Sequence, residues 1–140
     1  MKSSDSPKTI LIVEDDEFLR EIMTKKLRRA GYEVLEAMSG ERAMEAIKTK
    51  LPDLVLLDLI LPGMDGFEVM SKLRQQEASA KLPIIVFSNY AEQESIKRSK
   101  EFGVSMYLIK AELEPSDVLN RVNEYFASNK ESAPALTSPA

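Results

Sequence analysis

The sequence predicts an α/β protein with one five-stranded parallel sheet, doubly wound, so that helices cover both faces. Short apolar runs of strand length alternate five times with stretches whose apolar residues recur at helical spacing, and this order is typical of parallel sheets. The runs Thr9–Val13 and Leu54–Leu57 are apolar without interruption, as expected of strands buried on both faces. Right-handed crossovers between such strands leave nearly one arrangement of the chain.

The first strand, Thr9–Val13, follows a polar leader at residues 1–7, which we expect to be flexible. Apolar residues at helical spacing predict a helix over Glu17–Ala30. Gly31 ends this helix at the position where a left-handed residue is needed. Tyr32–Glu36 alternates apolar and acidic residues and therefore predicts a second, more exposed strand.

The middle of the chain predicts a helix over Glu41–Lys48 and a third strand within Asp53–Asp58. A loop dense in turn residues follows. Asp65 and Glu68 have the spacing of a capping box, so the next helix begins there and continues to about Gln76.

The last part of the chain predicts two strands, Ile84–Phe87 and Met106–Ile109, separated by a helix over Glu92–Phe102. Pro115 is placed at the first turn of a final helix. The apolar stripe of this helix consists of Val118, Leu119, Val122, Tyr125 and Phe126. Ser, Pro and Ala dominate residues 128–140, which predicts a flexible tail.

Composition excludes several classes of chemistry. The 140 residues suit one domain, and a net charge of −4 argues against direct binding to nucleic acid. The chain has no Cys and no His, so thiol catalysis, disulfides and zinc sites built on these residues are excluded. No apolar run has the length of a membrane span or a signal core. We expect a cytoplasmic protein without a membrane partner.

Four of the predicted strands end on residues that handle phosphoryl groups or metal ions. The first strand runs into Glu14 and Asp15, the third into Asp58, the fourth into Ser88 and the fifth into Lys110. Ligands of open parallel sheets bind beyond the carboxyl ends of the strands. These side chains are therefore expected to converge on one site.

Three neighbouring carboxylates repel each other unless a cation joins them. Oxygen ligands alone suit magnesium, with manganese as an alternative, and magnesium takes one or two carboxylates together with waters and phosphate oxygens. Asp58 is the candidate nucleophile, because a carboxylate can carry a phosphoryl group as an acyl phosphate. Taken alone, each of three residues has a simpler structural interpretation: Lys110 as a surface lysine, Ser88 as a turn residue and Asp16 as a helix cap.

The chain resembles the receiver domain of two-component response regulators over about residues 8–127. The matching motifs are ILIVEDDE, PDLVLLDLILPGMDG, PIIVFSN and MYLIK. The resemblance implies a flavodoxin-like sheet with strand order 2-1-3-4-5. It also implies that Asp58 accepts the phosphoryl group and that Asp58 and Asp15 bind Mg²⁺ directly, with Glu14 acting through a water and Ile60 contributing its backbone carbonyl.

By the same resemblance, Ser88 and Lys110 contact the phosphoryl group, and Tyr107 turns inward together with Ser88 when the switch operates. The implied donor is a sensor histidine kinase or a phosphotransfer protein. The implied output surface is formed by the fourth helix, fifth strand and last helix, and it contacts an unknown protein or a second copy of the chain. The protein is thus expected to be a phosphoacceptor switch rather than an enzyme acting on other substrates. Whether it works alone or belongs to a longer regulator stays open.

Two features of the sequence depart from the family pattern. The residue after Lys110 is commonly proline but is Ala111 here. Ile60 stands two residues after Asp58, and Tyr90 stands two residues after Ser88. Neither is placed to position an attacking water. This combination predicts slow self-dephosphorylation.

The sequence disfavours three other functions. A magnesium-dependent phosphotransferase or phosphatase that acts on small molecules through an aspartyl phosphate would often carry a second acid at position 60, where Ile60 stands. A nucleotide or flavin binder would need a glycine-rich loop after the first strand, where this chain has acids. An interaction module that no longer takes phosphate is disfavoured, because every expected position holds a competent residue.

Overall fold

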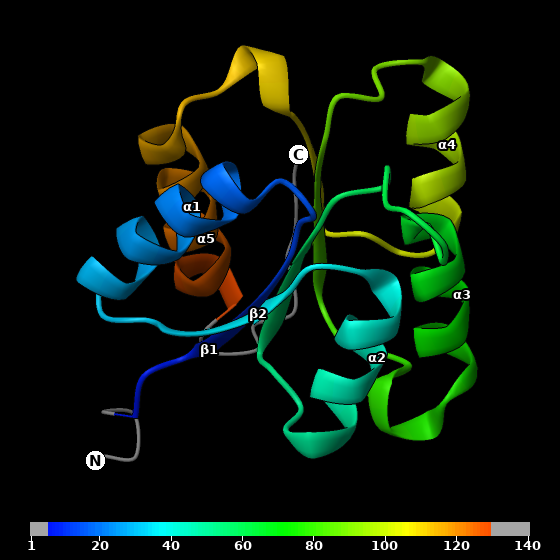
Figure 1. Cartoon of the computed structure of the whole chain (residues 1–140), viewed down its shortest axis with the longest axis horizontal. Coiled ribbons are helices and arrows are strands. Elements are labelled where there is room, and N and C mark those ends of the chain that lie inside the picture. The colour runs from blue at the N-terminus through cyan, green and yellow to red at the C-terminus, as the bar shows by residue number, and fades with distance from the viewer. Residues whose placement is uncertain (1–5, 130–140) are drawn as a thin grey trace.

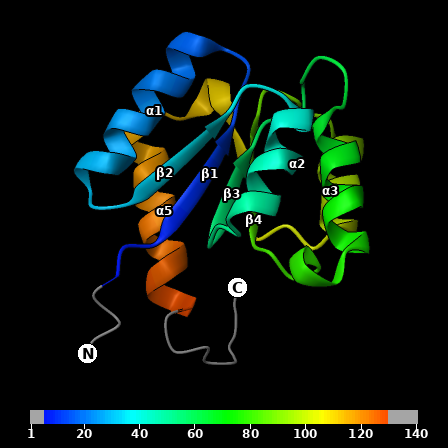
Figure 2. The ribbon, with the colours of Figure 1, turned by 60° about the horizontal axis from the view of Figure 1, so that its bottom comes forward.

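The computed structural model describes residues 6–129 and has three layers, with a central sheet covered by helices on both faces. The sheet is parallel and has the order β2-β1-β3-β4-β5, which confirms the predicted fold (Figure 1). Figure 2 shows β2, β1, β3 and β4 side by side in this order. The strands are β1 Thr9–Val13, β2 Glu33–Ala37, β3 Leu54–Leu57, β4 Ile84–Ser88 and β5 Met106–Ile109.

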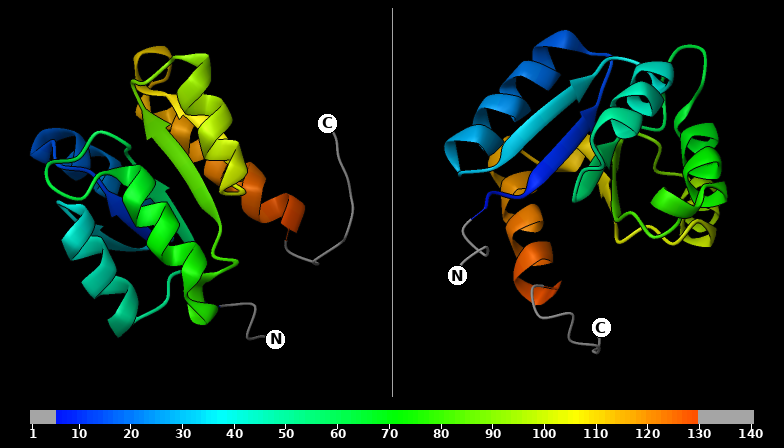
Figure 3. Two further views of the ribbon diagram at one scale, coloured as in Figure 1. Left: turned by 90° about the vertical axis from the view of Figure 1, so that its right-hand side faces the viewer. Right: turned by 90° about the horizontal axis from the view of Figure 1, so that it is seen from below.

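The helices alternate with the strands along the chain. They are α1 Glu17–Arg29, α2 Gly40–Thr49, α3 Gly66–Gln75, α4 Gln93–Glu101 and α5 Pro115–Asn129, with short 3₁₀ turns η2 Glu77–Ser79 and η3 Lys110–Glu112. Helices α1 and α5 cover one face of the sheet, and α2, α3 and α4 cover the other (Figure 1). In the right-hand view of Figure 3, the strands lie between α1 and α5 on one side and α2 and α3 on the other.

Alternate residues of the central strands face two separate apolar cores, as strand geometry requires. In β1, Leu11 and Val13 pack with α2 and α3, while Ile10 and Ile12 pack with α1 and α5. All residues of β1, β3 and β4 are buried. The uninterrupted apolar runs of the sequence therefore reflect strands that are covered on both faces.

The second strand begins and ends one residue later than the sequence predicted. Tyr32 lies between α1 and β2 and is bonded to the end of α1, because its backbone N–H donates to the carbonyl of Leu27 at 3.2 Å. Ala37 is part of the strand, because it pairs in register with Val13 of β1. Apolar alternation alone does not distinguish a helix-terminal residue from the first residue of a strand.

The helix ends follow the predicted signals. Gly31 has a φ of 100°, in the left-handed region, and Asp65 with Glu68 forms the predicted capping box. Residues 1–5 of the predicted leader and 130–140 of the predicted tail lie outside the described residues. Within residues 6–129, no helix is long and apolar enough to cross a membrane.

Candidate functional site

The carboxyl ends of β1 and β3 bring two acidic residues side by side. Val13 pairs with Leu57 in the parallel ladder, so the next residues, Glu14 and Asp58, are neighbours at the same edge of the sheet. Both residues are buried, with 3% and 4% exposure. The backbone N–H of Asp58 donates to the carbonyl of Val13 at 3.1 Å, which fixes this arrangement.

Lys110, which follows β5 at the edge of the sheet, reaches across β4 to both acids. Its Nζ lies 2.7 Å from Glu14 Oε1 and 2.8 Å from Asp58 Oδ2. The lysine side chain is only 15% exposed. Burial lowers the pKa of Lys110, but its hydrogen bonds to Asp58 and Glu14 outweigh burial, so the pKa lies above its ordinary value. The lysine is therefore charged at neutral pH.

The remaining oxygens of the two buried acids accept hydrogen bonds from the backbone. Glu14 Oε2 accepts from the N–H of Asp16 at 3.0 Å, and Asp58 Oδ1 accepts from the N–H of Ile60 at 3.1 Å. Burial raises the pKa of Glu14, although the bonds from Lys110 and Asp16 oppose this shift. The bonds from Lys110 and Asp16 therefore do not fully offset the effect of burial on the pKa of Glu14.

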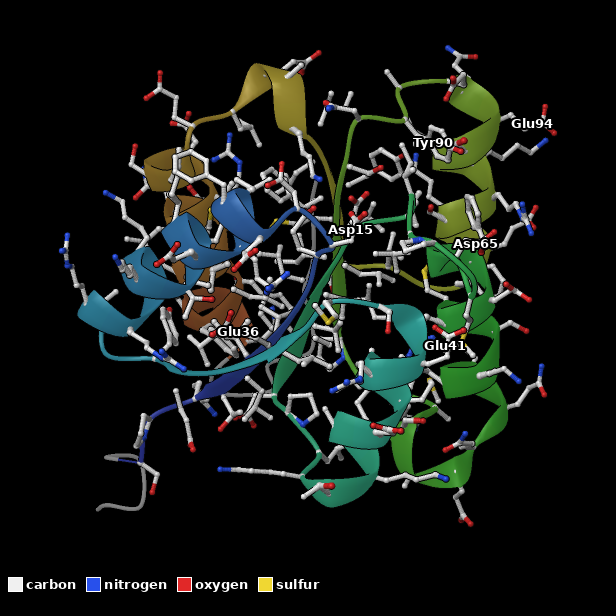
Figure 4. All side chains as sticks on the ribbon, viewed as in Figure 1. Asp15, Glu36, Glu41, Asp65, Tyr90 and Glu94 are labelled. Atoms are coloured by element: carbon white, nitrogen blue, oxygen red, sulfur yellow. The ribbon has the colours of Figure 1, made fainter. Side chains whose placement is uncertain are left out.

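Asp15 supplies the third carboxylate and, unlike the other two, is exposed. One carboxylate oxygen from each of Glu14, Asp15 and Asp58 lies within 4.8 Å of the others. Asp15 lies at the centre of the view in Figure 4, beyond the end of β1. Three acids facing one ammonium leave an excess of negative charge, and oxygen donors suit a hard divalent cation. The cluster fits a magnesium site.

Ser88 and Tyr107 are linked through the loop between β4 and α4. Ser88 is fully buried at the end of β4, and its Oγ accepts from the N–H of Tyr90 at 3.3 Å. The hydroxyl of Tyr107, a half-buried residue of β5, donates to the carbonyl of Tyr90 at 2.6 Å. Figure 4 shows Tyr90 beside the start of α4. The backbone N–H and carbonyl of Tyr90 therefore connect Ser88 and Tyr107, the two residues that are expected to form the switch.

Ile60 lies in the loop after Asp58, and the residue is 46% exposed. The loop is held at its far end by Gly66, whose N–H donates to the carbonyl of Leu59 at 3.0 Å. A Cβ at Gly66 would lie 2.6 Å from the Cα of Leu59, so this close approach requires glycine. Glu41 of α2 also accepts from the N–H of Met64 at 3.3 Å. The loop that carries Ile60 is thus fixed at several points.

Sequence reasoning missed Arg20, which supports the loop that carries the acids. Its Nη1 donates to the carbonyl of Glu14 at 2.8 Å, and its Nε lies 3.3 Å from Glu36 Oε1. Arg20 is 12% exposed and lies on the side of α1 that carries the buried residues Met23, Thr24 and Leu27. The peptide that joins Glu14 to Asp15 is therefore anchored by a guanidinium. An arginine in a helix gives no sequence signal for such a backbone contact.

Comparison with known proteins places this chain in a family. The family model of the response regulator receiver domain matches residues 10–123. The chain is 39% identical over 103 residues to the phosphate regulon transcriptional regulatory protein PhoB of Pseudomonas aeruginosa, covering 74% of this chain and 45% of that protein. It is 33% identical to the sporulation initiation phosphotransferase F of Bacillus subtilis, covering 72% of this chain and 80% of the relative.

Solved structures agree. A CheY-like response regulator receiver domain protein from Methanospirillum hungatei has a TM-score of 0.83 and 28% identity, with 91% of this chain and all of that chain covered. A putative response regulator from Chloroflexus aurantiacus has a TM-score of 0.78 and 37% identity, covering 86% and 98% of the two chains. The chain spans about half the length of several transcriptional regulators that it matches. It belongs to the family of response regulator receiver domains.

Proposed function

We propose that the protein is a phosphorylation-activated receiver whose Asp58 accepts a phosphoryl group from a phosphohistidine of a sensor kinase or a phosphotransfer protein. One observation carries this proposal. A buried aspartate, held by a lysine at 2.8 Å, lies within 4.8 Å of two further carboxylates at the end of a parallel sheet. Such a group of one cation and three acids suits transfer of a phosphoryl group better than it suits structural stability.

In the proposed reaction, an oxygen of Asp58 forms a bond to phosphorus while the phosphorus–nitrogen bond of the donor breaks. The electron pair of that bond stays on the imidazole of the donor. Lys110 already contacts Asp58 Oδ2, so its ammonium can follow the new charge onto a phosphoryl oxygen with little movement. The N–H of Ile60 holds the other oxygen, Oδ1, and orients the carboxylate.

Asp15, Asp58 and the backbone carbonyl of Ile60 are the proposed ligands of Mg²⁺. Glu14, whose two oxygens accept from Lys110 and Asp16, is proposed to act through a water, as the resemblance to the family implies. Magnesium bound in this cluster would neutralise phosphoryl oxygens during the transfer. Manganese shares the preference for oxygen ligands and is proposed as a substitute.

The proposed switch uses Ser88 and Tyr107. A phosphoryl group on Asp58 offers strong acceptors to the Ser88 hydroxyl, and a movement of Ser88 toward it would carry the loop at Tyr90, because Ser88 Oγ accepts from the N–H of Tyr90. Helix α4, which follows this loop, buries only Ser99 among its nine residues. A helix with so little buried surface can shift at low cost. We therefore propose that α4, β5 and α5 form the output surface.

The proposed partners are the phosphodonor protein, bound at the acidic site, and an output protein or a second copy of the chain, bound at α4, β5 and α5. The proposal places these contacts in the cytoplasm and assigns the receiver to residues 8–127. It includes no enzymatic activity on other substrates. A phosphotransferase acting on small molecules is not favoured, because the exposed side chain at position 60 is apolar and offers no second acid.

The test is to incubate the protein with Mg²⁺ and a small acyl phosphate and to measure its intact mass. The proposal expects a gain of one phosphoryl group, and none in Asp58→Asn. The matched control is Asp53→Asn, which alters an aspartate at the opposite end of β3, and it should be phosphorylated like the parent. A phosphoryl gain in Asp58→Asn equal to that of the parent would refute the assignment.

Once formed, the acyl phosphate is expected to persist for minutes or longer. Ile60 has no polar atom in its side chain, and the peptide groups of Tyr90 are engaged by Ser88 and Tyr107. Nothing at these positions orients a water for in-line attack. The lifetime can be followed by mass after removal of the donor, and Ile60→Gln should shorten it by supplying an amide. Loss from the parent within seconds would contradict this prediction.

A further inference from the structure

Ala111, the residue after the site lysine, makes a contact that proline could not make. Its backbone N–H donates to Oδ1 of Asn89 at 2.9 Å. Proline lacks this N–H. Position 111 is where the sequence departs from the common family pattern, and Asn89 directly follows the buried Ser88. Alanine in place of proline at position 111 thus supplies an N–H, and the side chain of Asn89, in the loop after β4, accepts from it.

The peptide group between Lys110 and Ala111 is held at both of its ends. Its N–H donates to Asn89, and its carbonyl accepts from the N–H of Leu113 at 3.2 Å. The orientation of this peptide determines the direction in which the Lys110 side chain leaves the backbone. That direction matters, because Nζ must stay within about 3 Å of both Glu14 and Asp58.

The sheet by itself holds Lys110 weakly. Among residues 6–129, strand β5 lies at the edge of the sheet and pairs only with β4. The ladder between them ends at the pair Ser88 and Ile109, one residue before the lysine. The Asn89 side chain supplies the next connection between the two segments beyond that pair. It thereby continues the attachment of β5 to β4 past the end of the ladder.

We propose that Asn89 is a positioning residue that holds the Lys110–Ala111 peptide, and with it the Lys110 ammonium, in place for phosphoryl transfer to Asp58. This inference rests on the proposed function. Asn89 does not touch the carboxylates and acts through Lys110. Together with the bond from Tyr107 to Tyr90 at 2.6 Å, it ties the loop after β4 to the segment around Lys110 on both sides of the lysine. A movement of that loop is then transmitted to the lysine.

The contact itself is tested by amide hydrogen exchange at Ala111, measured by nuclear magnetic resonance without metal or donor. Asn89→Ala removes the acceptor and should speed exchange at this amide about fivefold, the effect of one modest hydrogen bond. Asn89→Asp keeps an acceptor oxygen and should leave exchange slow. Equal exchange in the parent and in Asn89→Ala would overturn the proposal, whether or not the protein is phosphorylated.

The functional consequence is tested by the rate of phosphorylation at saturating Mg²⁺ in two backgrounds. Ala111→Gly keeps the N–H, so adding Asn89→Ala should slow phosphorylation about fivefold, again by the effect of one hydrogen bond. Ala111→Pro removes the N–H, and there the same substitution should have no further effect. An equal effect in both backgrounds would overturn the proposed route through Ala111. Absence of phosphorylation in the parent would instead refute the proposed function, leaving the exchange result to decide the contact.

Discussion

Replacing Lys110 by Met is expected to lower the rate of phosphorylation about 100-fold, as removal of one preorganised electrostatic contact does elsewhere. The ammonium lies 2.8 Å from Asp58 and is only 15% exposed, so water cannot take over its role at low cost. Methionine keeps the length and apolar surface of the side chain. The rate is measured at saturating Mg²⁺ and donor, so that a lower rate reflects the transfer step and not weaker binding of either.

The same substitution should reduce the free energy of unfolding of the metal-free protein by about 3 kcal/mol, because it leaves two buried carboxylates without their cation. Urea unfolding measures this loss, and added Mg²⁺ should restore part of it by binding the folded state. The control is Lys48→Met, an exposed residue of α2, which should change little. A Lys110→Met protein as stable and as reactive as the parent would contradict the assigned role.

The loss of stability should also depend on pH. The pKa of Glu14 is raised above 4.5 in the folded protein, because burial outweighs its bonds to Lys110 and Asp16. Removal of the lysine raises this pKa further. An acid whose pKa is raised by folding binds protons more tightly in the folded state, so its protonation favours folding at low pH. The destabilisation by Lys110→Met is therefore expected to be largest at neutral pH and to shrink as the pH falls through the raised pKa.

Removal of the divalent cation is expected to lower the rate of phosphorylation about 10³-fold, which corresponds to several kcal/mol of charge stabilisation in the transition state. The three clustered carboxylates repel an incoming phosphoryl group unless a cation compensates them. Asp15→Asn should weaken Mg²⁺ binding at least about 100-fold, since Asp15 is a proposed direct ligand. Calorimetric titration with Mg²⁺ measures the affinity without any donor.

Asp16→Asn is the matched control for the metal. Asp16 caps α1 through a bond from the N–H of Leu19 at 3.1 Å, and asparagine caps equally well. Its carboxylate is not part of the cluster. Magnesium affinity should therefore stay near that of the parent. If Asp15→Asn and Asp16→Asn had the same effect, Mg²⁺ would be responding to general surface charge, and the proposed ligand set would be wrong.

Much of this architecture could be predicted because its causes are local in the sequence. Uninterrupted apolar runs marked β1, β3 and β4, which are buried on both faces. Asp65 with Glu68 and the left-handed Gly31 marked helix ends through their own hydrogen bonds and dihedral angles. The convergence of Glu14, Asp15 and Asp58 followed from parallel strands whose carboxyl ends share one edge.

The contacts that hold the site in place could not be predicted in the same way. Arg20 reaches the carbonyl of Glu14, and Asn89 reaches the N–H of Ala111. In each contact a polar side chain binds a backbone group whose position depends on the assembled sheet. Residue type and periodicity do not encode that position. The one-residue shift of β2 has a similar origin, since Tyr32 is held by the end of α1.

The most direct measurement traps the acyl phosphate by reduction with borohydride and locates the product by tandem mass spectrometry of peptides. Reduction of an aspartyl phosphate converts that aspartate into homoserine. We expect homoserine at position 58, formed only after incubation with Mg²⁺ and donor. Homoserine at another acidic residue, with position 58 unmodified in a phosphorylated sample, would contradict it.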